Sequence, residues 1–334
     1  MKSLIAALVV VMLGALAPVG TAQAPANGPS RPPAQSSAIA AADAPVFPGR
    51  LYVDPYSDAR IVADWLAVRG QTTSAALIDT IADQPTAVWL GDWYASPTLL
   101  RSVLQRHLRA AEAQHATPVF VTYAIPNRDC GGYSAGGLAP DQYLAWNRVI
   151  ASELAGRHAV VLVEPDSLAM LASAKCASVA ASRPSVIHSA VKILASAGVA
   201  TYLDGGNARW LSPAAQADRL KAAGIADARG FFTNVSNFDR TQSERDYAGK
   251  VSSRVGWKHF IIDVSRNGNG WTGTWCNPPG AALGQDPQIT EGPDSKLDAL
   301  LWVKHPGASD GTCNGGPDAG AWFQSAAESL VRSR

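Results

Sequence analysis

The stretch Val160-Val161-Leu162-Val163-Glu164-Pro165-Asp166-Ser167-Leu168 predicts how the chain folds. Its run of valine and leucine is typical of a strand that is buried on both faces, as in a parallel sheet, and Pro165 cannot continue the hydrogen bonding of that strand. Asp166 follows at the position of a helix N-cap, before the apolar residues Met170 and Leu171 of a predicted helix. A lone aspartate here would indicate an ordinary cap, but carboxylates follow several other strands as well.

The same alternation of strand and helix continues through the chain from Val46 onward. The predicted strands are Leu51–Asp54, Thr86–Gly91, Pro118–Ile125, Ala159–Glu164, Ala200–Asp204, Gly230–Val235, Phe260–Val264 and Leu300–Lys304. Helical periodicity, often with an N-terminal proline, covers Thr98–Ala113, Pro140–Ala155, Pro184–Ala197, Pro213–Ala223 and Arg240–Val255. This order predicts an α/β fold with a parallel sheet, either a barrel or an open doubly wound sheet. No GxGxxG motif opens a helix after a strand, which disfavours the nucleotide-binding open sheet, and we predict no cofactor.

Polar residues, most of them carboxylates, end the predicted strands. In chain order they are Asp54, Asp92, Asp129, Asp166, Asp204, Asn234, Asp263 and Lys304. In a parallel barrel these ends open on one face, where the active sites of such barrels are built. Like charges brought together raise one another's pKa, which costs stability unless the site uses it. The ring therefore favours a functional mouth over helix capping alone, with Asp129 and Asp166 as a mutually perturbing pair.

Aromatic residues in loops close to these carboxylates add a second signal. They are Trp93, Trp210, Trp271, Trp275, Tyr56 and Tyr123. Each alone is as consistent with core packing, but an aromatic face also stacks on the apolar face of a sugar ring. Glycoside hydrolysis combines such platforms with two carboxyl groups, because one must donate a proton to the leaving oxygen while the other activates water.

Composition and the N-terminus narrow the class of protein. The 28 basic and 27 acidic residues give a near-neutral chain, without the charge that nucleic acid or an anionic membrane would select. Residues 1–24 combine Lys2, an apolar run and a small-residue ending, the pattern of a secretory signal peptide, and the run is too short for a comfortable membrane anchor. The Pro-, Ala- and Ser-rich segment 25–45 predicts a disordered leader. We expect a secreted protein with one folded catalytic domain over residues 46–334.

The four cysteines favour two disulfides over a metal site in an exported chain, since none forms a CxxC pair and no histidine lies at ligand spacing. Three connectivities are possible. We predict the sequential one, Cys130 with Cys176 and Cys276 with Cys313, which would link loops rather than the core.

Six motifs, in this order along the chain, resemble the signatures of glycoside hydrolase family 6 and together span essentially all of residues 46–334. They are YAIPNRDC (123–130), VEPDSL (163–168), YLDGGN (202–207), NVSNF (234–238), WCNPPG (275–280) and WVK with SDG (302–304, 309–311). The resemblance implies β-1,4-glucan hydrolysis with inversion, on a distorted parallel β/α barrel of about seven strands that is open on one side. One predicted strand should then be peripheral, either Leu51–Asp54 or the last.

The resemblance also implies roles for residues of the mouth. Asp166 would be the general acid, and Asp129 would keep the pKa of that acid high and help to relay a proton from the attacking water. Tyr123 would press on the sugar at the cleavage point, and Asp204 would tune the acid and bind substrate. Asp310 stands at the position of the proposed base, a disputed role because this carboxylate can act through water.

Further residues match substrate-binding positions of the family. They are Tyr56, Trp210, Asn234, Trp275 and Lys304. Tyr56 stands where some members have tryptophan, and the segment after Trp210 lacks the second tryptophan that processive members use. The loops between Asp129 and Asp166 and between Lys304 and Cys313 are short for an enzyme that roofs its site. These departures favour an open cleft and internal cutting of the glucan, by an endoglucanase rather than a cellobiohydrolase.

Two other classes of protein compete with this interpretation. A metal-dependent hydrolase on a similar barrel would normally recruit histidine, and only His305 lies near a predicted strand end. A non-catalytic glucan-binding protein would keep the aromatic residues and could dispense with the acids. The presence of Asp129, Asp166, Asp204 and Asp310 together favours the enzyme. We expect a monomer that binds a β-1,4-glucan or cellooligosaccharide and no metal, nucleic acid or membrane.

Overall fold

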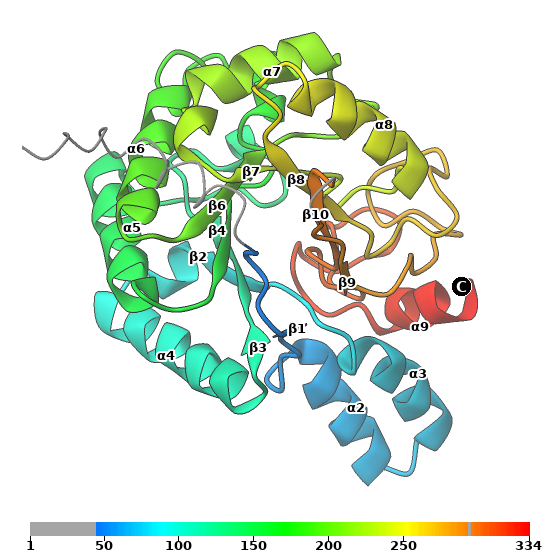
Figure 1. Ribbon diagram of the computed structural model, residues 1–334. Helices are drawn as coiled ribbons and strands as arrows, with labels where there is room; N and C mark the ends of the chain where they lie inside the picture. Colours follow the sequence, from blue (N-terminus) through cyan, green and yellow to red (C-terminus); the bar gives the residue numbers. More distant parts are fainter. Residues whose placement is uncertain (1–44, 293–294) are drawn as a thin grey trace, which may run out of the picture. The chain divides into compact units, whose positions relative to one another are not determined.

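The computed structural model describes residues 45–292 and 295–334 (Figure 1). The predicted signal peptide (1–24) and all but the last residue of the predicted leader (25–45) lie outside these ranges. None of the helices described is long and apolar enough to cross a membrane.

The sheet is a curled, mostly parallel one whose strands follow the order β2-β4-β5-β6-β7-β8-β10-β9. Its strands are β2 (Val88–Gly91), β4 (Val119–Tyr123), β5 (Val160–Val163), β6 (Ala200–Asp204), β7 (Gly230–Thr233), β8 (His259–Asp263), β10 (Leu297–Leu301) and β9 (Gln288–Ile289). The first seven of these pair in parallel, and β9 joins the edge of β10 in the antiparallel direction. This arrangement confirms the predicted distorted barrel.

The predicted strand at Leu51–Asp54 is peripheral, one of the two outcomes expected. Only Arg50–Leu51 forms a strand (β1), and it pairs with β3 (Ala116–Thr117) in a separate two-stranded sheet. The last strand is retained in the barrel but begins and ends earlier than predicted, as β10 at Leu297–Leu301. Lys304, which was predicted to end this strand, lies three residues beyond it.

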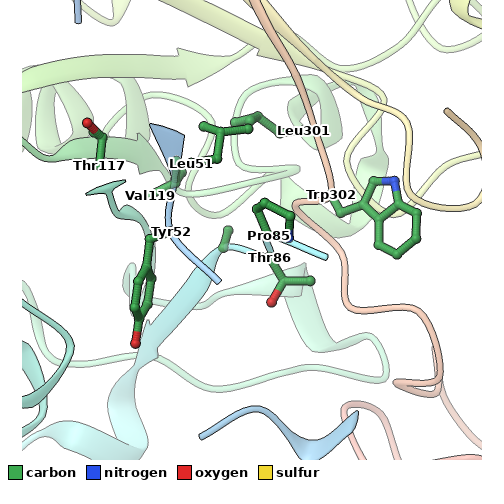
Figure 2. A pocket seen from close by; sticks show the side chains of 9 residues that line it. Leu51, Tyr52, Pro85, Thr86, Thr117, Val119, Leu301 and Trp302 are labelled. Carbon is green, nitrogen blue, oxygen red and sulfur yellow. The ribbon is translucent and has the colours of Figure 1, made fainter. Parts of the chain in front are cut away.

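The sheet does not close into a complete barrel, and in the described part of the chain β2 and β10 approach each other only at a narrow seam. A single isolated bridge joins Thr86 to Trp302, and the indole nitrogen of Trp89 donates a 2.8 Å hydrogen bond to the carbonyl of Val303. Figure 2 shows a small pocket beside this seam, between Leu51, Thr86 and Trp302. Its volume of about 10 Å³ is at the limit for one water molecule, so the pocket is a packing defect rather than a binding site.

Helices surround the sheet, as the strand-and-helix alternation predicts (Figure 1). They are α2 (Asp58–Val68), α3 (Thr72–Ala82), α4 (Pro97–Ala113), α5 (Pro140–Leu154), α6 (Arg183–Ser196), α7 (Pro213–Ala222), α8 (Thr241–Ser252) and α9 (Gln324–Arg332). Proline within the first two positions starts four of them, α4 to α7, because its fixed φ suits a helix and its missing N–H would have no partner there. The hairpin of α2 and α3 and the last helix α9 were not predicted, and α9 packs against α3.

The core has two layers that the alternation of β5 defines. Val161 and Val163 belong to the layer between sheet and helices, whereas Val160 and Leu162 point into the barrel. All four are fully buried, as expected for a strand covered on both faces.

The helix predicted after Asp166 does not form. Two short 3₁₀ turns, Ala169–Ala172 and Ala174–Cys176, take its place, and Asp166 itself has φ +68°. Asp166 is therefore not the cap of an α-helix, and its side chain is left for another role.

Candidate active site

Four of the predicted carboxylates gather at the carboxyl ends of the strands, three from different loops and one from the last position of a strand. They are Asp129 after β4, Asp166 after β5, Asp204 at the end of β6 and Asp310 after β10. The electrostatic neighbours of Asp166 include the other three and Lys304. The mouth predicted from the sequence therefore exists as a cluster of charges around Asp166.

Asp166 stands on a loop that is held from both sides. The carboxylate of Asp204 accepts hydrogen bonds of 2.9 Å from the backbone nitrogens of Leu168 and Ala169, and a third from that of Gly206. Arg219 of α7 donates to the carbonyls of the same two residues, at 2.6 and 3.0 Å. The backbone next to Asp166 thus has its donors and acceptors occupied, which fixes the direction of that side chain.

The pKa of Asp166 lies well above the usual value for aspartate. Desolvation is the main cause, followed by the negative charges of Asp204 and Asp129, while Lys304 opposes the shift and Asp310 adds to it. Asp129 contributes to this rise, in the direction that the family resemblance implies, but Asp204 contributes more. A carboxyl group in such a place keeps its proton at a pH where ordinary carboxylates have lost theirs.

Asp129 forms a hydrogen-bonded chain with Ser134 and Tyr123. Its Oδ2 accepts from the backbone nitrogen of Ser134 at 2.7 Å and from the hydroxyl at 3.0 Å. The same hydroxyl lies 2.8 Å from the phenol oxygen of Tyr123. Burial, with the charge of Asp166 next, raises the pKa of Tyr123 above its usual value, so the phenol stays neutral.

The loop that carries Asp129 is fastened to the end of β2. Arg128 donates to Asp92 at 2.8 Å and to the carbonyl of Ser134 at 2.8 Å, and its guanidinium lies over the ring of Tyr123. The other oxygen of Asp92 accepts from Gly137 at 2.8 Å. Asp92 was predicted to belong to the mouth, and it does so as a support for the loop of Asp129.

Glu164 and Arg183 hold the preceding part of that loop. The fully buried carboxylate of Glu164 accepts from the backbone nitrogens of Ala124 and Ile125 at 3.1 Å. Arg183 donates to the carbonyls that follow, those of Pro126 and Asn127. The chain between Tyr123 and Asp129 is therefore fixed by a buried anion and a buried cation.

Asp310 is in the opposite electrostatic situation to Asp166. Arg266 contacts its Oδ2 at 2.9 Å and Lys304 its Oδ1 at 3.2 Å, and the backbone nitrogen of Asn277 donates a further bond at 3.0 Å. Burial by itself would raise the pKa of Asp310, but the two cations outweigh it and lower the pKa below the usual range. Burial lowers the pKa of Lys304 in turn, against the effect of Asp310.

Left-handed backbone conformations concentrate in these same loops. Six of the eleven non-glycine residues with positive φ in the described part of the chain form pairs two residues apart: Asn127 with Asp129, Glu164 with Asp166, and Asn234 with Ser236. Such conformations cost of order 1–3 kcal/mol each and persist where the surrounding structure enforces them, often at functional sites. The strain marks the ends of β4, β5 and β7 as the part of the barrel shaped for chemistry.

The other two aspartates at predicted strand ends organise loops. The carboxylate of Asp263 accepts from the backbone nitrogens of Ser265, Lys304 and, at longer distance, Val303. Asp54 accepts from Tyr56 and lies 3.5 Å from His107 of α4. Both carboxylates hold loop backbone rather than cap a helix, since the N-cap of α2 is Ser57 and Asp263 is followed by a loop.

Asn234 has a supporting position instead of the predicted substrate contact. It is fully buried, and its amide donates to the carbonyls of Asp239 and Asp263 while accepting from the nitrogen of Asp239. A side chain with its donors and acceptor used in this way, and with no exposed surface, cannot bind a sugar directly. It positions the loop after β7.

The remaining substrate-binding predictions have mixed surroundings. Trp275 is 51% exposed, Trp210 is partly exposed beside Gly206, and the ammonium of Lys304 lies 3.2 Å from Asp310. Tyr56 packs against α4, with the guanidinium of Arg106 4.5 Å from its ring centre and His107 edge-on. Their contacts with a sugar stay predictions.

Both predicted disulfides are present, Cys130 to Cys176 and Cys276 to Cys313. The first links the loop of Asp129 to the turns after Asp166. The second links the loop of Trp275 to that of Asp310. Each therefore connects two loops that carry predicted site residues.

Sequence reasoning missed several supporting residues, Arg266 above all. Arg266 lies three positions beyond the end of β8, a place where a polar residue could have been suspected, but it follows the strand-end carboxylate rather than standing at it. Glu164 was seen only as a neighbour of Asp166. Among residues 45–292 and 295–334, histidine, cysteine and carboxylate side chains form no group of three or more that could hold a metal ion.

The chain matches the family model described as glycosyl hydrolases family 6 over residues 48–334. The chain belongs to glycoside hydrolase family 6. Endoglucanase A of Cellulomonas fimi is 42% identical over 282 residues, which are 84% of this chain and 61% of that protein. This chain thus spans less than two thirds of that relative. Endoglucanase 1 of Streptomyces halstedii is 36% identical over 87% of this chain and 91% of its own length.

Solved structures of the family resemble this one closely. The endoglucanase Cel6 from Mycobacterium tuberculosis, determined in complex with methyl-cellobiosyl-4-deoxy-4-thio-β-D-cellobioside, has a TM-score of 0.78 and 38% identity, over 85% of this chain and 97% of that one.

Cellobiohydrolases are also among the sequence relatives. A probable 1,4-β-D-glucan cellobiohydrolase C of Aspergillus fumigatus is 31% identical over 84% of this chain and 76% of its own length. Family 6 proteins similar to this chain therefore carry both endoglucanase and cellobiohydrolase names.

Proposed function

We propose that this chain is a secreted, inverting β-1,4-glucanase of the endo type, with Asp166 as the general acid. The observation that carries the proposal is the contrast between two carboxyl groups of one mouth. The environment of Asp166 raises its pKa and that of Asp310 lowers it. Two titratable groups whose surroundings drive their pKa values apart are the pattern of an acid and an anion with separate roles.

In the proposed reaction the proton of Asp166 moves to the glycosidic oxygen as the bond from that oxygen to the anomeric carbon breaks. A water molecule attacks the anomeric carbon from the opposite face and forms the new bond, which inverts the configuration. The proton that this water loses passes to a carboxylate of the mouth and then to solvent. Asp166 regains a proton from solvent for the next turnover.

Asp129 is a better receiver of that proton than Asp310. Two cations stabilise the charge of Asp310, which makes it a weak base. Asp129 accepts hydrogen bonds from Ser134, whose hydroxyl continues to Tyr123, and it forms no salt bridge within residues 45–292 and 295–334. We therefore assign Asp310 to charge balance and to orientation of water, and Asp129 to proton relay.

The endo assignment rests on the short loops around the mouth and on the endoglucanase names of the relatives at 36–42% identity. It is tested by following the viscosity and the reducing ends of soluble carboxymethyl-cellulose in parallel. An endo enzyme lowers the viscosity well before many ends appear. Release of cellobiose with unchanged viscosity would instead indicate the cellobiohydrolase type, and glucan binding without any new reducing ends would indicate a non-catalytic protein.

Secretion as a monomer is part of the same proposal. The support for secretion is the signal-peptide pattern of residues 1–24 and the presence of two disulfides, which persist in oxidising compartments. N-terminal sequencing of protein recovered from the medium of a secreting host tests it, with a start near residues 25–27 expected. Light scattering on the same sample tests the monomer.

A further inference from the structure

We propose that Tyr133 is a substrate-binding residue that forms, together with Trp275, a two-ring platform for a glucose unit beside Asp310. The inference deepens the proposed function and rests on it, since it names a sugar contact of the same mouth. Trp275 was predicted to bind substrate from its motif, whereas nothing in the sequence pattern singles out Tyr133.

The first observation is the exposure of both rings in the mouth. Tyr133 is 52% exposed and Trp275 is 51% exposed, their ring centres are 6.1 Å apart, and their planes meet at 51°. They come from different loops, Tyr133 from the loop after β4 and Trp275 from the loop after β8. Two tilted aromatic faces that remain open to solvent form a trough in which a flat sugar ring can stack on one face and touch the other.

The second observation is how closely Tyr133 lies over the loop of Asp310. A Cβ atom added to Gly311 would be 2.5 Å from Cγ of the Tyr133 ring, and the φ of Gly311 is +143°. Only glycine lets the ring and this backbone approach so closely. The ring therefore rests on the residue next to Asp310, and a sugar on its open side lies beside the catalytic carboxylates.

The third observation is that the platform has a fixed base. The side-chain nitrogen of Asn277 donates to the carbonyls of Gly311 and Cys313, and the disulfide from Cys276 to Cys313 joins the same two loops. On the other side, Asp129 binds the backbone nitrogen of Ser134, the residue that follows Tyr133. Rings held in this way lose little freedom when substrate binds, which favours affinity.

The test measures equilibrium binding of cellohexaose to proteins that carry Asp166→Asn, so that the ligand is not cleaved. Tyr133→Ala is expected to weaken binding about three- to tenfold, the range for loss of one aromatic contact. Tyr133→Phe should bind within about twofold of the parent, because it keeps the stacking face. Tyr133→Leu keeps an apolar contact with Gly311 but has no face, and it should resemble Tyr133→Ala.

A matched control is Trp257→Ala. Trp257 is 62% exposed and lies between α8 and the start of β8, at the opposite end of the strands from the mouth. The Trp257→Ala substitution should leave cellohexaose binding unchanged.

A double variant tests whether the two rings act together. Tyr133→Ala and Trp275→Ala should weaken binding less than additively when combined, because each ring needs the other to form the trough.

Two outcomes would overturn the inference. Tyr133→Phe could lose as much binding as Tyr133→Ala, which would assign the effect to the hydroxyl. Tyr133→Ala could instead bind cellohexaose as the parent does, and a lowered kcat of Tyr133→Ala in the otherwise unaltered chain would then make the ring a brace between loops. Hydrolysis of soluble glucan by the unaltered chain tests the proposed function separately, and it can succeed while this inference fails.

Discussion

The guanidinium of Arg266 lies 2.9 Å from Oδ2 of Asp310, and both side chains are buried. A buried carboxylate depends on such a partner, because an unpaired charge in this place would have to be desolvated without compensation. Arg266 also donates to the carbonyl of Ser236, so it connects the loops after β7, β8 and β10. It is both an electrostatic and a structural element of the mouth.

Arg266→Met is therefore expected to destabilise the fold by roughly 3–5 kcal/mol, since it leaves Asp310 with one cation instead of two. The free energy of unfolding from urea titration measures this. Arg60→Met is the matched control, because Arg60 pairs with Asp79 and Asp83 near the surface, and it should cost about 0–1 kcal/mol. Adding Asp310→Asn to Arg266→Met should restore part of the loss, and failure to do so would show that the charge is not the cause.

Asp166→Asn should nearly abolish hydrolysis of unactivated cellooligosaccharides while leaving their binding intact. A positioned general acid contributes about 10²–10⁴-fold, and asparagine keeps the shape without the proton. Substrates with a good leaving group, such as dinitrophenyl cellobioside, should lose much less, because their departure needs little protonation. Equal losses of kcat on both kinds of substrate would exclude Asp166 as the acid.

The pH profile should report the surroundings of Asp166. Because its pKa is raised, the protonated form persists above the usual range for aspartate, and kcat/KM should fall as the pH rises through that higher value. Asp204→Asn removes a negative neighbour and should move this alkaline limb to lower pH. Asp218→Asn, an exposed change on α7, should leave the limb in place. An unmoved limb in Asp204→Asn would mean that another group sets it.

The stability of the fold at acid pH should depend on Asp310, whose pKa is shifted in the opposite direction to that of Asp166. Its pKa is lower in the folded than in the unfolded chain, so the folded state binds its proton less well. The stabilisation it provides is present above about pH 4, the usual pKa of unfolded aspartate, and is lost as the pH falls through the folded value. Asp310→Asn should thus flatten the fall in melting temperature between about pH 4 and pH 2, and an unchanged slope would contradict this.

The stereochemistry of the product tests the inverting mechanism. Proton NMR of a fresh cellooligosaccharide digest should show the α-anomer first, followed by mutarotation towards β. Inverting enzymes hold their two carboxyls roughly 6.5–9.5 Å apart to admit water, whereas retaining enzymes need about 5–5.5 Å. Early β-anomer would indicate a covalent intermediate and would remove the role proposed for Asp129.

The positions of strands and most helices could be predicted because their cause is local. The continuous apolar run of β5 and the proline starts of α4 to α7 are visible in the sequence. The α2 and α3 hairpin was missed because it follows a short strand at the edge of the fold, and its burial depends on α9, far away in the chain. The helix expected after Asp166 failed because Asp204 and Arg219 occupy the backbone there, a tertiary effect that no local pattern contains.

The site divides in the same way. Asp129, Asp166, Asp204 and Asp310 could be found because strand ends of a parallel barrel meet on one face. The sequence could not predict which of these carboxylates is held ionised. That depends on Arg266, which pairs with Asp310 across 44 residues of sequence. Asn234 was misjudged for the same reason: a motif gives the residue type, whereas only the packing shows that its amide is already used.

The narrow seam of the barrel has a consequence for its motions. Neighbouring parallel strands from β2 to β10 share three or four registered residues, but the segments next to β2 and β10 meet at the isolated bridge of Thr86 and Trp302. Local opening needs the fewest broken hydrogen bonds at this point. Backbone amides along the seam should therefore exchange with deuterium sooner than those between β5 and β6, because the sheet separates locally along this line first.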